Sequence, residues 1–416
     1  MKQRYCEIDK ELCKQAVKNF FKGKWHRNDV SCVIEEYAGI KRRDIAKESF
    51  IGKETTLKDE AIECIACETL NRLERLREGD DDALELDDIV FRLVPDGMNG
   101  KIREIAYCCI FHQIFNHILV LALMPLFSAK ILPTQYASIP HKGQTGLKKH
   151  VMKKFRKKKL AIKTCKKTDV KKAYPSTMYS VIIKMVEKEI PSATLHIKLL
   201  KALAQKSPKG CLIIGGYLDA WLFNFLMSYA LRYALSLRKV KRGESVKLVK
   251  DVVAFMDDFD FMGSREKDVE KTIKAIDKYI SSNFGLSLKM GAKTKLLSFE
   301  EEKARRNDRP SVKSGRYTDV GGYQMHHGYI TIRKKIFVRL RRTYLRAMRF
   351  IKKYGYLCLQ IAHRVNAYFG YLTNSSSKYV REKYHTDWLH NIAREVVSHY
   401  AKLENEMKRR IYNVSH

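Results

Sequence analysis

The sequence is poor in acidic side chains. Its 416 residues include 46 Asp and Glu against 81 Lys and Arg, which leaves a formal net charge of +35 at pH 7. A field of this sign attracts polyanions, so nucleic acid and anionic membrane surfaces are the partners to consider. The excess of basic residues is too large for a metabolic enzyme with a neutral surface.

The sequence also lacks a long apolar run, and its first residues do not have the pattern expected of a leader peptide. Its N-terminal residues, MKQRYCEIDKELC, contain no apolar stretch with a small-residue cleavage site. The longest apolar stretch, from Ile118 to Phe127, is too short to cross a bilayer, which takes about 20 apolar residues. We therefore expect a cytoplasmic protein that has no membrane partner.

A paired cysteine framework is also missing. The ten cysteines are scattered along the chain, as is typical of reduced thiols in a cytosol. Cys64 and Cys67 have the spacing of a zinc or redox pair, but no second pair or nearby His completes a set of about four ligands. Apolar residues recur around them at helical spacing, which predicts an amphipathic helix that carries two half-buried thiols.

What is present is enough apolar material for a substantial core. Hydrophobic residues make up 45% of the chain, and at roughly 100–200 residues per domain its length corresponds to about two to four domains. Residues 1–95 are predicted to be mostly helical, and the acidic loop 80–82 interrupts the pattern. From Asp96 onward, short apolar runs alternate with turn residues and long basic helices.

Two segments combine an apolar side with a strongly basic side. Residues 148–167 contain eleven Lys and Arg residues among apolar ones, and residues 333–353 repeat the pattern. Either face could simply be solvated, but two of them in so basic a chain favour contact with backbone phosphates. The residues from these segments that we expect to contact nucleic acid are Lys153, Lys154, Arg156, Arg333, Lys334 and Arg341.

The sharpest local pattern is a pair of aspartates between two apolar runs. Asp257 and Asp258 follow the run 252–256 and precede a second run at 259–262, which predicts a β-hairpin with the two carboxylates at its turn. Burying carboxylates beside apolar side chains costs several kcal/mol unless a cation compensates them. A divalent metal ion is the simplest compensation.

A third aspartate completes the set. The strand-like segment 167–176 supplies Asp169 just before a turn. Three carboxylates offer the hard oxygen ligands that Mg²⁺ prefers, and Mn²⁺ is an alternative ion. Two Mg²⁺ ions can activate a 3′-hydroxyl and stabilise the leaving pyrophosphate. The predicted reaction is therefore nucleotidyl transfer, with Asp169, Asp257 and Asp258 as catalytic and metal-binding residues.

These segments resemble motifs of the reverse transcriptases, polymerases with the shape of a right hand. Phe255-Met256-Asp257-Asp258 resembles their [YF]xDD box, and the segment from Asp169 to Tyr174 resembles their first palm motif. The resemblance spans residues 96–377. It implies an α+β fold with an N-terminal helical extension at 1–95, fingers at 96–165, a palm with an antiparallel sheet at 166–330 and a fingers insertion near 180–210, and a helical thumb at 331–416.

Further family motifs follow along the chain in the expected order. Residues 367–371, for example, resemble the thumb segment of bacterial members. The resemblance implies these additional site residues: Lys101 and Arg103 at the incoming triphosphate, Val170 as a carbonyl ligand of the metal, Gln135 and Lys142 in a fingers motif that contacts nucleic acid, Lys293 at the leaving pyrophosphate, and Gly322 and Tyr323 in the primer grip.

Tyr174 is expected to decide which polymer is made. Five residues after the first metal aspartate, the family places an aromatic ring against the sugar 2′-position. A ring there excludes a ribose hydroxyl sterically, so deoxynucleotides are the expected substrates. The alternative is a tyrosine that only packs a turn.

One segment departs from the family pattern. Gly215 keeps the frame of the motif that lies under the nascent base pair, but Asp219-Ala220 stands where the family has a Ser-Gln or Ser-Pro pair. A carboxylate there would repel triphosphate but accept a hydrogen bond from an exocyclic amino group. We hypothesise that Gly215, Asp219 and Ala220 contact the nucleotide and restrict its choice. The alternative is a compensated change with ordinary copying.

The resemblance is greatest to defence-associated reverse transcriptases of bacteria and phages, followed by those of retrons and diversity-generating retroelements. It implies antiviral RNA-templated DNA synthesis from deoxynucleoside triphosphates, with a noncoding RNA and a DNA product. A second reverse transcriptase or a second copy of the chain is a further implied partner. An RNA-dependent RNA polymerase and a catalytically silent RNA-binding scaffold are the alternatives. Tyr174 argues against the first, and the presence of all three aspartates argues against the second.

Overall fold

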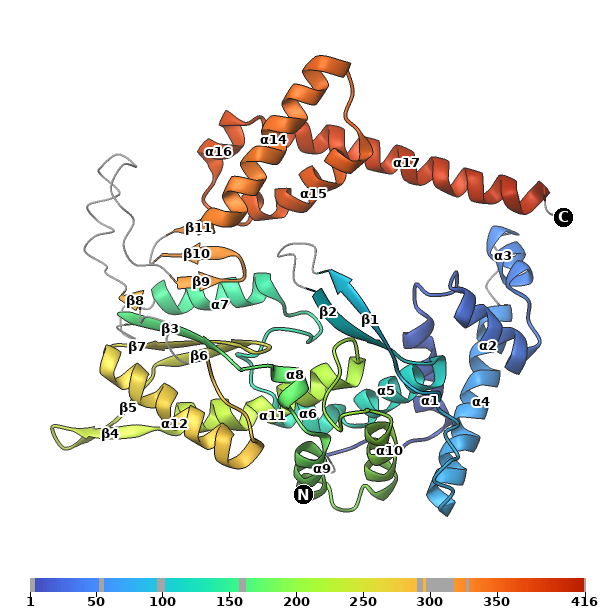
Figure 1. Ribbon diagram of the computed structural model, residues 1–416, viewed down its shortest axis with the longest axis horizontal. Helices are drawn as coiled ribbons and strands as arrows, with labels where there is room; N and C mark the ends of the chain where they lie inside the picture. Colours follow the sequence, from blue (N-terminus) through green and yellow to red (C-terminus); the bar gives the residue numbers. More distant parts are fainter. Residues whose placement is uncertain are drawn as a thin grey trace.

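The computed structural model shows a chain that combines many helices with small antiparallel sheets. It describes residues 4–51, 56–95, 102–156, 162–289, 295–296, 318–326 and 329–414. Figure 1 shows the N-terminal helices on one side, a sheet in the middle and a group of C-terminal helices above it. The predicted α+β class is confirmed.

A four-stranded sheet lies at the centre of the molecule. Its strands are β3 (Thr164–Asp169), β6 (Asp251–Phe255), β7 (Asp258–Gly263) and β8 (Lys295–Leu296). The order is β6-β7-β3-β8 and all neighbours are antiparallel, so strands that are distant in the sequence lie side by side. β6 and β7 form the predicted hairpin, with Phe255 opposite Asp258. This arrangement places the end of β3 beside the hairpin turn.

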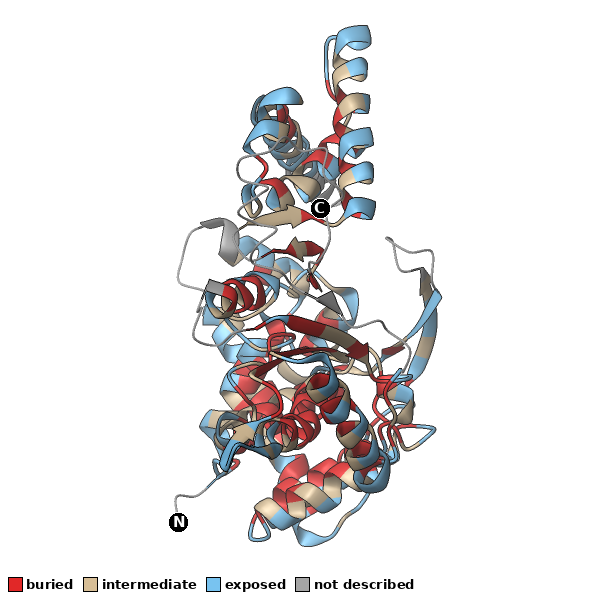
Figure 2. Cartoon of the chain, turned by 90° about the vertical axis from the view of Figure 1, so that its left-hand side faces the viewer, coloured by how far each residue is buried: buried red, intermediate tan, exposed pale blue. Residues whose placement is uncertain are grey.

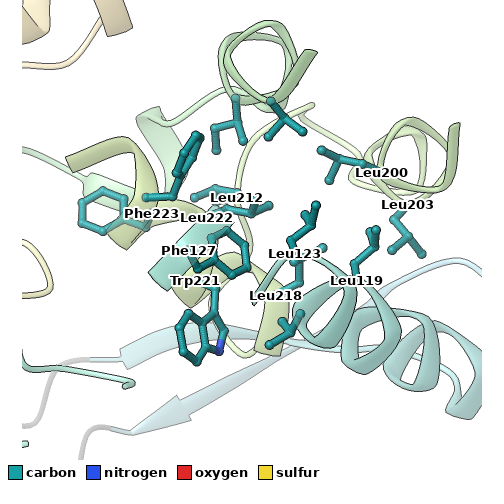
Figure 3. Packing of buried hydrophobic residues seen from close by; sticks show 14 of the residues in the cluster. Leu119, Leu123, Phe127, Leu200, Leu203, Leu212, Leu218, Trp221, Leu222 and Phe223 are labelled. Carbon is teal, nitrogen blue, oxygen red and sulfur yellow. The ribbon is translucent and has the colours of Figure 1, made fainter. Parts of the chain in front are cut away.

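Helices cover one face of this sheet and form the main core. α11 (Tyr217–Ser236) and α12 (Glu266–Phe284) lie against the strands, and α5 (Ile110–Ala122), α6 (Met124–Lys130) and α10 (Thr194–Gln205) complete the core behind them. Side chains alternate across a strand, and Phe259 and Phe261 of β7 both point into this core. Phe127 and Trp221 stack with ring centroids 5.4 Å apart among the leucines shown in Figure 3. Buried residues are concentrated here in Figure 2.

The N-terminal helices belong to the same core. They are α1 (Lys10–Phe21), α2 (Asn28–Ala38), α3 (Arg42–Ile51) and α4 (Thr56–Glu78). Asp9 caps α1 by accepting the N–H of Leu12 at 2.8 Å. Buried residues of α1, α2 and α4 join one continuous cluster with those of α5 and α11. Cys64 and Cys67 lie half-buried on α4, as predicted.

Shorter elements connect these helices. Two of them are β-ribbons, β1 (Val90–Pro95) with β2 (Ile102–Tyr107) and β4 (Arg238–Lys241) with β5 (Glu244–Lys247). Two are helices, α8 (Ala173–Ser176) and α9 (Tyr179–Glu189). The first ribbon crosses the expected boundary at residue 95, because Val94 pairs with Arg103 and Pro95 with Ile102.

The second face of the central sheet packs against a smaller core. This face is covered by α7 (Gln144–Arg156) and by a separate three-stranded sheet beside α7. The strands of that sheet are β9 (Thr318–Val320), β10 (Tyr323–Met325) and β11 (Ile330–Ile332). Val151 and Phe155 of α7 meet Cys165 and Met262 of the central sheet there. Because Cys165 and Asp169 lie on the same side of β3, Asp169 and its cross-strand partner Asp258 project from this face.

The C-terminal helices have a separate core. They are α14 (Lys334–Tyr354), α15 (Leu359–Thr373), α16 (Lys378–Lys383) and α17 (Thr386–Val414). The basic amphipathic helix predicted at 333–353 is confirmed as α14, which buries Ile336, Leu340 and Tyr344. The Tyr344 hydroxyl donates to the carbonyl of Val365 on α15 at 3.3 Å.

Within the described ranges, no single helix has the length and apolar composition needed to cross a membrane. α5 and α6 meet that test only as a pair, and they are bent by 56° at the break between them.

Candidate functional site

The three predicted aspartates meet at one end of the central sheet. Asp169 is the last residue of β3 and lies opposite Asp258, the first residue of β7. Asp257 occupies the two-residue turn between β6 and β7, and its carbonyl accepts the N–H of Val170 at 3.0 Å. Backbone pairing therefore brings together carboxylates from two distant segments of the chain.

The hairpin turn is held in an uncommon conformation. Met256 has φ of +55°, a left-handed value that costs a non-glycine residue about 1–3 kcal/mol. Its thioether sulfur lies 3.6 Å from the side-chain amide of Asn224 on α11. That amide also donates to the carbonyls of Ala220 and Ala137, at 3.0 and 3.1 Å. Packing of α11 under the turn thus compensates its strain and fixes where Asp257 stands.

The site concentrates negative charge that is partly shielded from water. Burial raises the pKa of Asp257, and the neighbouring carboxylates of Asp258 and Asp169 raise it further. Neutralising cations are therefore favoured here, because they relieve both effects.

Two lysines supply part of that neutralisation. The Lys167 amine donates to Asp258 Oδ2 at 2.7 Å, and the Lys289 amine forms an ion pair with Asp169. Burial by itself would lower the pKa of Lys167, but Asp260 and Asp258 outweigh it and the pKa is raised. Lys289 is also fixed through its backbone, since its N–H donates to the carbonyl of Asp169 at 2.8 Å.

Carboxylate oxygens are the donors that Mg²⁺ prefers, so the chemistry of Asp169, Asp257 and Asp258 suits this ion. In the described part of the chain, however, no group of three or more His, Cys, Asp or Glu side chains stands in a metal-binding arrangement. Lys289 and Lys167 engage the carboxylates of Asp169 and Asp258 instead. Binding of a metal ion by all three aspartates would require these two lysines to release them.

Tyr174 lies next to the aspartates, on the one-turn helix α8. Its ring stacks on Phe223 of α11 with centroids 5.6 Å apart and planes 15° from parallel. Burial raises the pKa of its hydroxyl, and the charges of Asp219 and Asp257 raise it further. The stack with Phe223 therefore fixes the position of the Tyr174 ring near Asp257.

Asp219 does not occupy the position that the sequence suggested. Its side chain is only 1% exposed. Oδ1 accepts the hydroxyl of Tyr179 at 2.7 Å and the N–H of Ile213 at 2.9 Å. A Cβ at Gly216 would lie 1.8 Å from Oδ2. The carboxylate faces inward and braces the start of α11, which contradicts the hypothesis that it reads the nucleotide.

Gly215 and Ala220 flank this internal contact. Gly215 has φ of +112°, and a Cβ there would lie 2.9 Å from the carbonyl oxygen of Ala106 on β2. The residue before it, Ile214, accepts the N–H of Ala106 at 2.8 Å. Gly215 is therefore required for close approach of two backbones, while Ala220 is half-buried within α11.

Gln135 and Lys142 also turn toward the protein rather than toward a nucleic acid. Gln135 is completely buried and donates to the carbonyl of Asn224 at 2.7 Å. The Lys142 amine donates to the carbonyl of Gln135 at 3.1 Å, and burial lowers its pKa. Both side chains satisfy backbone groups of the loop around residues 132–137, and contact of either one with nucleic acid stays a prediction.

The residues assigned to a primer grip are internal as well. A Cβ at Gly322 would lie 2.8 Å from the ring of Tyr371. Tyr323 is 6% exposed, its hydroxyl lies 3.4 Å from the carbonyl of Gly370, and the Lys148 amine lies 5.2 Å from its ring centroid. Gly322 and Tyr323 therefore pack against α15, and Tyr323 also against Lys148 of α7, while their contact with a primer stays a prediction.

The predicted basic residues fall into two groups. Lys154 forms an ion pair with Asp251, and Arg333 forms one with Asp319, at 3.3 and 3.4 Å. The exposed group comprises Lys153 on α7, Lys334 and Arg341 on α14 and Arg103 on β2. Arg156 is the last residue of α7. Lys101 and Lys293 lie outside the described residues.

Lys167 and Lys289 were absent from the residues proposed from sequence. Lys167 precedes Asp169 by two positions in a strand, so alternation of side chains would have placed both on one face. For Lys289 no local signal exists. Its position depends on the pairing of Val170 with Leu288, which forms only in the folded chain.

The chain has little detectable similarity to known proteins. No protein-family model and no curated protein matches the chain. Among the solved structures that match is telomerase from Candida albicans in complex with a fragment of telomeric RNA, with 11% sequence identity and a TM-score of 0.41 over 74% of this chain. The chain spans 61% of that telomerase chain. Its function therefore has to be inferred from its own site.

Proposed function

We propose that this chain is a polymerase of the reverse transcriptase type, which copies RNA into DNA. The observation that carries the proposal is the convergence of Asp169, Asp257 and Asp258 at one end of a small antiparallel sheet. In this proposal the four-stranded sheet is the palm and helices α14 to α17 are the thumb. The order of the family-like motifs along the sequence supports the same assignment.

The side chains around the aspartates have complementary tasks in this proposal. Asp169, Asp257 and Asp258 would hold Mg²⁺, with the Val170 carbonyl as a further ligand. Bound Mg²⁺ would supply charge neutralisation for the triphosphate and activation of the primer hydroxyl. The Tyr174 ring, which Phe223 holds in place, would exclude a ribose 2′-hydroxyl. Lys289 would exchange its contact with Asp169 for one with the phosphates of the nucleotide.

The basic face of α14 would hold the template. Its exposed side chains include Lys334 and Arg341, while the opposite face packs into the C-terminal core. Such a surface contacts backbone phosphates and recognises the shape of an RNA rather than its sequence. We extend the proposal to the defence-associated group of bacteria and phages, with a folded noncoding RNA and a second copy of the chain as partners.

The test is primer extension with purified protein. An RNA template with a DNA primer is offered deoxynucleotides or ribonucleotides in the presence of Mg²⁺ or Mn²⁺. The double variant Asp257→Asn, Asp258→Asn should lose synthesis and keep RNA binding. The matched control is Glu74→Gln, Glu78→Gln, which removes two exposed carboxylates from α4 and should behave as the unmodified protein does.

Two outcomes would redirect the proposal. Efficient incorporation of ribonucleotides in place of deoxynucleotides would indicate an RNA-dependent RNA polymerase. Tight RNA binding without synthesis, unchanged by the Asp257→Asn, Asp258→Asn double substitution, would indicate a scaffold.

A further inference from the structure

A basic β-ribbon extends from the molecule well away from the three aspartates. β4 and β5 form a two-stranded sheet, and within the described residues they pair with no other strand. In Figure 1 the ribbon lies beyond α12, on the side of the molecule away from α14 and the other C-terminal helices. It is therefore remote from the surface that the proposed function assigns to template and primer.

One face of the ribbon fixes it to the rest of the protein. Lys239 forms an ion pair with Asp268 of α12, and both side chains are largely buried. Val246, directly opposite Lys239, is half-buried on the same face. At the base of the ribbon, the N–H of Leu248 donates to the carbonyl of Leu237 at 3.0 Å. The ribbon thus has a defined orientation and leaves its other face free.

The outer face brings like charges together. Arg238 lies directly opposite Lys247, and both side chains are exposed. Neither forms an ion pair with a carboxylate in the described part of the chain. Like charges directly opposite each other destabilise a strand pair. Between them and the tip lies Val240, which is 76% exposed although it is apolar.

The turn at the tip of the ribbon also contains a residue, Arg242, that is unfavourable at its position. Arg242 and Gly243 form its two-residue turn, with φ of +52° and +79°. Turns of this kind favour Asn, Asp or Gly at the first position, because a larger side chain pays about 1–3 kcal/mol for a left-handed backbone. Lys241 and Arg242 are both exposed there.

These features lower the stability of an element that is marginal to begin with. An isolated two-stranded hairpin is barely stable in water. Residues with an unfavourable local conformation or an unfavourable cross-strand neighbour, and with no gain in packing, are characteristic of functional sites. Arg238 and Lys247 on the outer face, and Lys241 and Arg242 at the tip, all expose a positive charge, and the one carboxylate among residues 238–247 is Glu244, opposite Lys241. A polyanion bridging these side chains would relieve their mutual repulsion.

We propose that the β4–β5 ribbon is a second nucleic-acid-binding site, which contacts the phosphate backbone of a folded, double-stranded RNA region outside the polymerase cleft. A duplex is favoured over a single strand because residues 238–247 include no aromatic side chain on which unpaired bases could stack. The choice of RNA over DNA rests on the proposed function. In that setting the ribbon would anchor part of a large RNA whose other end is copied.

The experiment measures binding of a fluorescent RNA duplex of about 20 base pairs, longer than the roughly 16 that one double-stranded-RNA-binding module spans. The full-length variant Arg238→Gln, Lys241→Gln, Arg242→Gln, Lys247→Gln is compared with a control that loses the same charge. That control is Lys18→Gln, Lys22→Gln, Lys41→Gln, Lys47→Gln, four exposed lysines in or directly beside the N-terminal helices. Duplex DNA of the same sequence, single-stranded RNA and anionic lipid vesicles complete the set.

The ribbon variant should bind the RNA duplex at least about tenfold more weakly than the control variant does at physiological salt. The slope of log affinity against log salt should fall by about one for each lost phosphate contact, hence by about two to four. Its thermal stability should be equal to or above that of the unmodified protein, because repulsion is removed.

Equal loss of RNA binding in the two variants would overturn the proposal, since general charge would then explain it. The proposal would also be overturned if the ribbon variant bound more weakly than the control variant only to duplex DNA or only to vesicles. Extension of a short primer on a short template should be unaffected by the ribbon substitutions. Absence of any extension by the unmodified protein would instead count against the polymerase assignment, which separates the two failures.

Discussion

The side-chain amide of Gln135 donates a 2.7 Å hydrogen bond to the backbone carbonyl of Asn224. The side-chain oxygen of Gln135 accepts the N–H of Leu132 at 2.8 Å, so both the oxygen and the nitrogen of this buried amide have hydrogen-bond partners. Asn224 in turn contacts the sulfur of Met256, the residue before Asp257. Two buried amides therefore connect the loop at 132–137 with the turn that carries an aspartate.

We predict that Gln135→Ala lowers the free energy of unfolding by about 1–3 kcal/mol, because it leaves buried polar groups without partners. Proteins with this substitution should also lose part of any polymerase activity, since the turn at Met256 loses support. Urea unfolding measures the first effect. Gln205→Ala, at an exposed position, is the control and should change stability by less than about 0.5 kcal/mol. Equal stability of the two variants would contradict this reading of the contact.

Tyr174→Ala should weaken discrimination against ribonucleotides. The Phe223 ring holds Tyr174 beside the site, so removal of the tyrosine ring opens space for a 2′-hydroxyl. We expect the preference for deoxynucleotides to fall by about tenfold or more, a typical effect of one steric contact in a binding pocket. Single-nucleotide extension with each substrate measures the ratio. Tyr174→Phe keeps the ring and should keep the preference for deoxynucleotides. Loss of that preference in Tyr174→Phe would show that the hydroxyl, and not the ring, discriminates against ribonucleotides.

Lys289→Ala should strengthen metal binding. The Lys289 amine pairs with Asp169 and so competes with any cation for that carboxylate. Its side chain is 54% exposed, and exposed ion pairs contribute about 0.2–1 kcal/mol, which corresponds to an increase in affinity of about 1.4- to 5-fold. Mn²⁺ binding to the protein without substrate, followed by electron paramagnetic resonance, measures it directly. Lys278→Ala removes an exposed lysine from α12 and is the control. Weaker binding in Lys289→Ala than in this control would show that the lysine supports the metal instead.

Asp219 makes stability depend on pH in the acidic range. Burial raises its pKa from 3.8 to about 6. The folded protein therefore binds more protons than the unfolded chain between these values. The stability contributed by the protonated form is fully present below pH 3.8 and is lost as the pH rises through 6.

We expect this residue to make the protein about 1 kcal/mol more stable at pH 5 than at pH 7.5. Asp219→Asn should remove that part of the pH dependence, while its Oδ1 can still accept from Tyr179 and Ile213. Denaturant unfolding at the two pH values tests the prediction. Glu74→Gln is the control and should retain the full dependence. An unchanged profile in Asp219→Asn would show that the carboxylate is not the titrating group.

Patterns that depend on neighbours in the chain were predictable. The hairpin around Asp257 follows from two apolar runs with polar residues between them, and α14 follows from apolar residues at helical spacing. These inferences hold because strand and helix periodicity is set by the backbone itself.

The direction in which a polar side chain points was decided by tertiary packing. Gln135, Asp219 and Tyr323 stand in segments that resemble nucleotide-contacting motifs, yet each is buried and bonded to the protein. Conversely, Lys289 reaches Asp169 only because Val170 pairs with Leu288. A buried polar group must find a partner, and that partner is supplied by whichever distant segment packs against it. The sequence by itself determined which residues carry charge and where strands and helices form, while the fold decided which of those charges face the site.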